Sequence, residues 1–195
     1  MNLRPELGIL ETWVTRVGET LDAPVFQEGT FIYRQMTAPH VAFLKAVRGV
    51  QSLHSLCALA SKGLFIDCGT ITRCLFDCNS EIYFLLESYP SVSEDVSKFV
   101  QHFVSTSLVG ETDGVPPVAS KKVHAARARL LEQRVEFGES FGGMRRSYEA
   151  LCLYVHADYP AVMEIYGGRC GEYKFHMSGV PSQRARRYNR KLWME

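Results

Sequence analysis

The longest stretch of regularly spaced apolar residues lies between Gly63 and Pro90. Apolar side chains recur there at steps of three and four residues, which is the spacing of one face of an α-helix. They are Leu64, Cys68, Ile71, Leu75, Cys78, Ile82 and Leu85. Other large apolar residues fall outside this stripe, and a helix that is apolar most of the way round packs inside a bundle. We therefore expect a central helix here, with Leu75 and Ile82 buried.

The same spacing predicts helices on the N-terminal side of this segment. A heptad-like seam predicts a first helix that packs inside the bundle and ends near Pro24. The seam consists of Leu7, Leu10, Val14, Val17 and Leu21. A loop is expected over residues 24–36. The next helix begins after Thr37, a suitable N-cap, and ends at Gly63, which suits a left-handed C-cap.

Three further helices are expected beyond Pro90. Residues 91–94 have the spacing of a capping box and open the first of them. Residues 121–137 form the second, and their thin apolar stripe and many charges predict a peripheral position. The third covers residues 144–158.

The end of the chain has a different pattern. Residues 167–179 alternate between apolar and polar side chains, which predicts a strand or an extended arm. Residues 182–195 then predict a short basic helix. Together these elements describe a single all-α domain over residues 1–195. It is a helical bundle of about six helices, with residues 160–195 as a peripheral C-terminal arm and basic helix.

The charges of the chain nearly cancel. There are 22 Lys and Arg against 21 Asp and Glu, so the net charge of +1 gives no general attraction to nucleic acid or membrane. The N-terminus lacks a basic segment followed by a long apolar run, and no apolar stretch approaches the ~20 residues of a membrane span. We therefore expect a cytoplasmic protein without a membrane partner. The six cysteines are then expected to be thiols rather than disulfides.

Two groups of polar residues stand out against this apolar background. Arg73 and Asp77 lie four residues apart in the central helix and share one of its faces. They are either a structural ion pair or, if that face is covered, part of a polar site. His156 follows an apolar run and lies two residues before Asp158. It fits a cap at a helix C-terminus, or a general base beside an acid.

These residues also form a pattern that resembles a known family. The residues that carry the resemblance are Gly63, Leu64, Asp67, Arg73, Asp77, Tyr148, Val155 and His156. They are similar to a group of uncharacterised bacterial helical proteins that looks related to the HEPN families (higher eukaryotes and prokaryotes nucleotide-binding). The resemblance covers about residues 40–160. It implies an all-α bundle that often dimerises, with RNA cleavage or an accessory role in defence or toxin–antitoxin systems. It also implies that Arg73, Asp77 and His156 lie close together as catalytic residues.

The HEPN nuclease signature is an Arg followed, after four to six residues, by a His. The pairs with this spacing are Arg34 and His40, Arg48 and His54, and Arg169 and His176. Only Arg48 and His54 lie inside a predicted helix, so they are the alternative catalytic pair. Gly49 follows Arg48 at a position where catalytic members usually carry a polar residue, so a non-catalytic role stays open.

Basic residues with an aromatic neighbour gather near the C-terminus. They are Arg184, Arg186, Arg187, Tyr188, Arg190 and Lys191. Arginine with aromatics can hold phosphates and stack on bases, so we expect this segment to bind RNA or, alternatively, an acidic protein. A plain solubilising tail is the third interpretation.

No metal site and no cofactor are expected. Cys68, Cys74 and Cys78 crowd one helix without a C-x-x-C spacing, and small buried apolar residues are the better interpretation of them. The chain also lacks a phosphate-binding loop and a dinucleotide fingerprint.

Two functions from different classes follow. The first is a cytoplasmic HEPN-like protein, with a homodimer as one expected assembly, that binds or cleaves RNA in a defence or toxin–antitoxin setting. The second is a non-catalytic, protein-binding regulator or inhibitor of a nucleic-acid-processing machine, for example a phage or mobile-element anti-defence protein.

Overall fold

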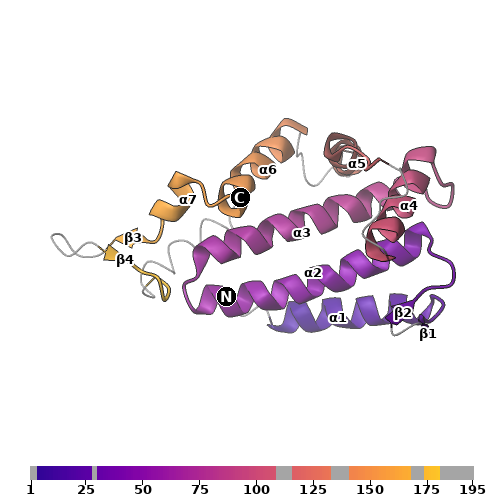
Figure 1. Cartoon of the computed structure of the whole chain (residues 1–195), viewed down its shortest axis with the longest axis horizontal. Helices are drawn as coiled ribbons and strands as arrows, with labels where there is room; N and C mark the ends of the chain where they lie inside the picture. Colours follow the sequence, from indigo (N-terminus) through magenta and orange to yellow (C-terminus); the bar gives the residue numbers. More distant parts are fainter. Residues whose placement is uncertain (1–3, 28–29, 109–115, 133–140, 168–173, 181–195) are drawn as a thin grey trace. The chain divides into compact units, whose positions relative to one another are not determined.

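The computed structural model describes residues 4–27, 30–108, 116–132, 141–167 and 174–180. Over these ranges the fold is all-α, which confirms the helical bundle predicted from the apolar spacing. The described residues form seven helices, which are labelled in Figure 1: α1 (Arg4–Glu19), α2 (Ala38–Ser61), α3 (Phe65–Leu86), α4 (Glu94–Leu108), α5 (Ser120–Glu132), α6 (Phe141–Val155) and the short α7 (Tyr159–Met163).

Two small antiparallel strand pairs accompany the helices in the described part of the chain. Strand β1 (Val25–Gln27) pairs with β2 (Thr30–Ile32), and this hairpin replaces the loop expected over residues 24–36. Strand β3 (Tyr166–Gly167) pairs with β4 (Lys174–Phe175), so part of the expected C-terminal arm is indeed extended. Each hairpin carries a pair of aromatic rings on opposed residues, with centroids 5.1 Å apart in the first and 4.9 Å apart in the second.

Residue contacts group the chain into two compact units, which are described separately. Unit 1 contains Gln51–Phe76 and Arg145–Glu195, and unit 2 contains Asn2–Val50 and Asp77–Met144. Helices α2 and α3 each contribute residues to both units, so the division does not cut the chain into two consecutive segments. The single domain over residues 1–195 stays a prediction.

Four helices form the core of unit 2. Its buried residues are Ala38, Val41 and Ala42 of α2, Phe84 and Leu85 of α3, Val96 of α4, and Val123 and Ala126 of α5. The rings of Phe84 and Phe99 lie 5.6 Å apart within it. Burial of such apolar surface, at about 25 cal/mol per Å², is the main force that holds these helices together.

Helix α5 lies in this core, and the prediction that it is peripheral is wrong. Val123 and Ala126 are only 4% and 0% exposed. Their small side chains allow the helix to approach closely despite its thin apolar stripe. Its charges are accommodated by ion pairs, because the Arg129 Nη2 donates to Glu87 over 2.9 Å and the Lys122 Nζ donates to Asp95 over 2.8 Å.

Helix α3 is covered over most of its surface, as expected for a central helix, but its most buried residues differ from those predicted. Cys78, Phe84 and Leu85 are buried. Leu75 and Ile82 are only half-buried, so the prediction for these two residues is wrong. Apolar spacing identifies a helix, whereas the degree of burial depends on which neighbours cover each part of the stripe.

The helix ends confirm one expected cap and correct another. Gly63 has a φ of 72°, and its N–H donates to the Ala60 carbonyl over 3.1 Å, as a left-handed C-cap requires. At the start of α4 the cap is Ser93, whose Oγ accepts from the Val96 N–H over 3.2 Å. The capping box over residues 91–94 is therefore wrong, because Glu94 is already the first residue of the helix.

Candidate functional site

Helices α3 and α6 pack against each other in unit 1, in the region where the sequence places Arg73 and His156. The ring of Tyr154 lies against the backbone of Gly69, and further along α3 the rings of Phe76 and Tyr148 lie 6.1 Å apart. Residues later in α3 thus contact residues earlier in α6, so the two helices run antiparallel here. This contact positions the candidate site residues of unit 1.

Arg73 is held at this contact by an aromatic ring. Its guanidinium carbon lies 3.8 Å from the ring centroid of Tyr148, a cation–π arrangement, and the residue is half-buried. Such a contact contributes about 0.5–2 kcal/mol depending on desolvation. Because the ring already covers one face of the guanidinium, this geometry accounts for an arginine in a mostly apolar helix.

Tyr154 is a residue of this site that the sequence did not single out. Its hydroxyl donates to Glu164 Oε1 over 2.9 Å, and its backbone carbonyl accepts from the Thr70 hydroxyl over 3.4 Å. Its ring fills the space that a side chain at position 69 would take. The available signal was Gly69 itself, since a glycine inside a long helix often marks a close approach of another element.

His156 lies directly after the end of α6 and is exposed. The turn that follows is a Schellman motif, in which the Asp158 N–H donates to the Leu153 carbonyl over 2.9 Å. Ala157 takes the left-handed position of the motif, with a φ of 50°. His156 therefore has the position of the C-cap that its sequence context predicted, and its ring is accessible to solvent.

Of the proposed trio, Arg73 and His156 belong to unit 1 and Asp77 belongs to unit 2. Arg73 contacts Tyr148, and a helical rise of about 1.5 Å per residue puts His156 about 12 Å further along α6 than Tyr148. Asp77 lies one turn beyond Arg73 on α3 and is half-buried. The close approach of these three residues in one catalytic site stays a prediction.

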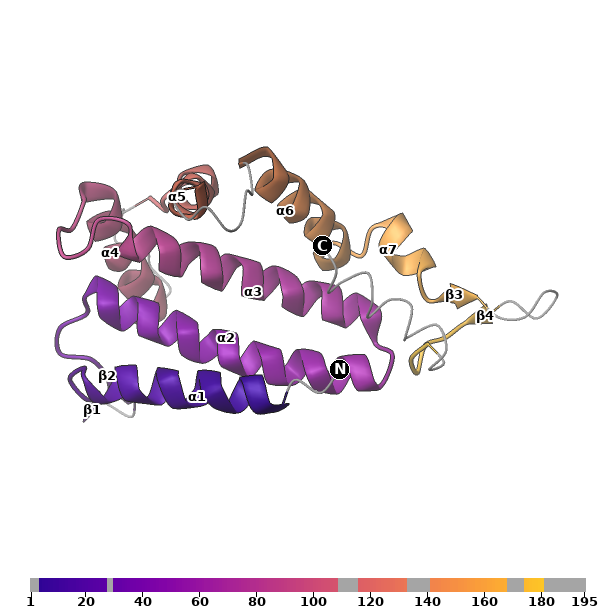
Figure 2. The same cartoon turned by 180° about the vertical axis from the view of Figure 1, so that it is seen from behind.

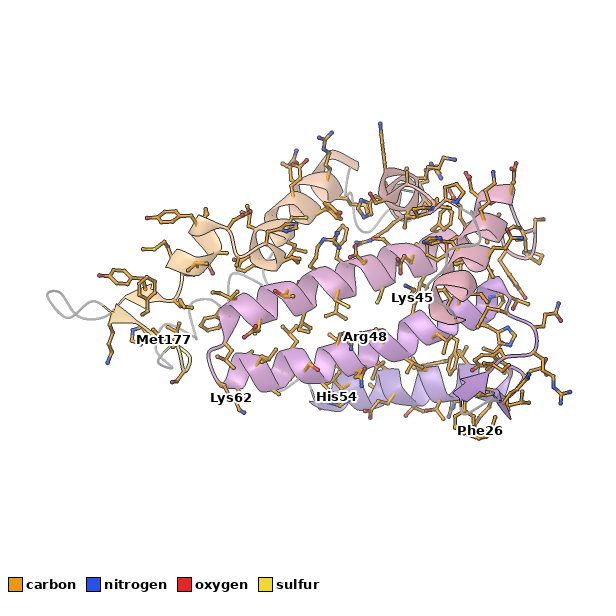
Figure 3. The ribbon with its side chains drawn as sticks, viewed as in Figure 1. Phe26, Lys45, Arg48, His54, Lys62 and Met177 are labelled. Carbon is orange, nitrogen blue, oxygen red and sulfur yellow. The ribbon has the colours of Figure 1, made fainter. Side chains whose placement is uncertain are left out.

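The alternative pair, Arg48 and His54, lies on α2, as the sequence predicted. Figure 3 shows both side chains on this helix, and both residues are exposed. Six residues correspond to about 120° of rotation and about 9 Å of rise, so the two side chains leave α2 on different sides. A catalytic role for this pair also stays a prediction.

The described cysteines are thiols, and two of them, Cys68 and Cys78, are buried as small apolar residues. The other three are Cys57, Cys74 and Cys152, and the sixth cysteine, Cys170, lies outside the described residues. Burial, followed by the nearby charges of Asp67 and Cys57, raises the pKa of the Cys68 thiol to about 11. Within the described part of the chain, no group of three or more His, Cys, Asp or Glu side chains could hold a metal ion.

Helix α1 in unit 2 exposes large apolar side chains, which the sequence did not predict. Helix α1 runs beside α2 (Figure 2), and a Cβ added at Gly18 would lie 2.8 Å from the ring of Phe43 in α2. Leu7 is the buried large apolar residue of α1, at 7% exposed. Leu10 and Val17 were expected to pack inside the bundle, but both are exposed. The close approach of the Phe43 ring at Gly18 sets which side of α1 faces inward, and a seam drawn from large apolar residues omits a glycine.

We call the apolar residues that α1 exposes its outer face. They are Ile9, Leu10, Trp13 and Val17, and Trp13 is 61% exposed. The β1–β2 hairpin, next to the C-terminal end of α1, exposes Phe26 and Phe31 at 66% and 70% (Figure 1). Large exposed apolar patches on folded proteins are often interaction sites, so these residues are the candidate interaction surface of unit 2.

The predicted basic segment, Arg184 to Lys191, lies outside the described residues. Among the helices that are described, none is both long and apolar enough to cross a membrane.

Comparisons with known proteins add no relative. The chain matches no family model, no curated protein and no solved structure. The likeness to the HEPN families therefore stays a prediction from the quoted residues, and the function has to be argued from the surface of the molecule itself.

Proposed function

We propose that this protein is a non-catalytic, protein-binding module and that the outer face of α1 is its binding surface. The observation that carries the proposal is the exposure of Ile9, Leu10, Trp13 and Val17 along one helix. Each exposed apolar Å² costs about 25 cal/mol relative to burial, so a partner that covers this face gains directly from the hydrophobic effect. Trp is also the residue type most enriched among the energetic hot spots of protein interfaces.

The outer face lies outside the buried core of unit 2. The core of unit 2 is built from α2, α3, α4 and α5, and α1 meets α2 at Gly18, against the ring of Phe43. A polar outer face would satisfy the fold equally well, because amphipathic surface helices normally place polar residues there. Ile9 and Trp13, the two most exposed of these residues, therefore contribute little to the stability of the unit.

The test compares what wild-type protein and two serine variants retain when they are purified from the cells that naturally produce them. Trp13→Ser removes the centre of the outer face. Met177→Ser is the matched control, because Met177 is 84% exposed and lies in the other unit. We expect a protein partner that wild type and Met177→Ser retain and Trp13→Ser loses. A partner retained equally by all three, or RNA recovered without protein, would overturn the proposal.

A second candidate, RNA cleavage of the HEPN type, draws support from the exposure of His156 and the neighbouring Asp158 at the end of α6. An accessible imidazole next to an acid is suited to general acid–base catalysis. The assay incubates RNA with wild type, His156→Ala and His54→Ala. Cleavage that is lost with either substitution supports a nuclease and names its histidine, whereas unchanged or absent cleavage argues against it.

A further inference from the structure

We propose that the partner that the outer face of α1 fits is a second copy of this chain, bound with the two α1 helices antiparallel. The inference rests on the proposed function, because it identifies the partner of the same surface. The order of residues along α1 gives this dimer a register, a two-fold symmetry and two ion pairs.

Two opposite charges lie within the apolar outer face. At about 100° per residue, Ile9, Trp13, Glu6 and Arg16 fall within an arc of about 80°, with Leu10 and Val17 at one edge of it. Glu6 and Arg16 are both exposed, one towards each end of α1. The Arg16 guanidinium carbon lies 5.9 Å from the ring centroid of Trp13, so the cation is next to the most exposed apolar residue of the helix.

This charge order makes the face complementary to itself. Turning a copy of α1 by 180° about an axis through position 11 brings Glu6 of one chain opposite Arg16 of the other. The same turn brings Ile9 opposite Trp13, because both pairs are centred on that position. In this single register the apolar residues of the two helices contact each other, and an ion pair forms at each end of that contact.

A two-fold arrangement follows from the self-complementarity, because an isologous interface uses the same patch on both subunits. A parallel pairing lacks this match, since it would place Glu6 against Glu6 and Arg16 against Arg16. The face offers four apolar and two charged residues per chain, against about 20–30 residues a side in a standard interface, so we expect a reversible dimer rather than an obligate one. Phe26 and Phe31 of the hairpin remain available to extend the surface beyond the end of α1.

The test uses charge reversal at the two ends of the register. E6R places two Arg residues on the face and R16E places two Glu residues, so each variant alone opposes like charges in its own dimer. Two attractive contacts per dimer become repulsive, and we expect the self-association constant to fall roughly tenfold or more at low salt. An equimolar mixture of E6R and R16E restores both contacts and should form a heterodimer of near wild-type affinity, measured by sedimentation equilibrium over a concentration series.

The outcomes separate this inference from the proposed function. Met177→Ser should dimerise like wild type, and thermal melts check that E6R and R16E remain folded. If wild type stays monomeric over the whole series, or if the mixture stays monomeric while wild type dimerises, the antiparallel dimer is overturned. If a different protein is then captured through Trp13, the protein-binding function still holds. If neither a dimer nor a Trp13-dependent partner is found, the protein-binding function is overturned as well.

Discussion

Replacing Gly69 by Ala tests the packing of α3 against α6 through the sign of its effect on stability. In an exposed helix interior this substitution stabilises by about 1 kcal/mol, because Ala has the highest helix propensity. At position 69, however, the added methyl would overlap the ring of Tyr154, with its Cβ 2.7 Å from the Tyr154 Cβ. The ring must then move, and its hydroxyl loses the 2.9 Å hydrogen bond to Glu164.

The expected magnitude follows from these opposing contributions. Overpacking costs about 1–3 kcal/mol and the lost hydrogen bond about 0.5–1.5 kcal/mol, against the gain of about 1 kcal/mol in propensity. The net effect of Gly69→Ala is a loss of about 1–3 kcal/mol in the free energy of unfolding. Gly49→Ala in α2 is the matched control, because nothing lies within 4 Å of a Cβ added there, and it should stabilise by about 1 kcal/mol.

Urea titration of the two variants measures both free energies on the same scale. A double-mutant cycle with Tyr154→Ala isolates the cause, since Gly69→Ala should become stabilising once the ring is absent. If Gly69→Ala stabilises the wild-type background as Gly49→Ala does, the contact between α3 and α6 is not formed as described.

Three further predictions concern burial, backbone strain and a thiol. Leu85→Ala should lower the free energy of unfolding, measured by urea titration, by about 2–5 kcal/mol because Leu85 is fully buried. Leu75→Ala should lower it by less, because Leu75 is half-buried. Ala157→Gly should raise the free energy of unfolding by about 0.5–1 kcal/mol, because a left-handed φ disfavours a side chain. Iodoacetamide at pH 8 should modify Cys152 before Cys68, as read by peptide mapping, because only the thiolate reacts and burial raises the pKa of Cys68 from 9.0 to about 11. The raised pKa also means that the contribution of Cys68 to stability is complete below pH 9 and is lost as the pH rises towards 11.

The long helices were predictable because their sequences repeat one spacing over many turns, as in residues 63–90. The β1–β2 hairpin was not, since strands of three residues are too short to establish a period. Small residues account for the other differences. Ala126 was part of the thin stripe from which a peripheral helix was predicted, yet its small side chain lets α5 enter the core. Gly18 admits the Phe43 ring, and a search for large apolar side chains gives a glycine no weight.

The candidate site was predictable only as a choice of residues. The resemblance predicted Arg73 and Asp77 close to His156, which stays a prediction, whereas the contact between Arg73 and Tyr148 was not predicted. The ring that holds the guanidinium and the role of Tyr154 at Gly69 depend on how α3 and α6 dock, which the sequence of either helix alone does not specify.

Site-specific photo-cross-linking tests most directly whether the outer face of α1 binds protein. A photoreactive benzoyl-phenylalanine replaces Trp13 in one variant and Asn79, an exposed polar position on α3, in the control. After irradiation in the cells that naturally produce the protein, we expect a discrete covalent protein adduct at position 13, including the adduct of two copies of this chain, and none at position 79. Equal adducts at both positions, or no protein adduct at position 13, would contradict the assignment of this surface.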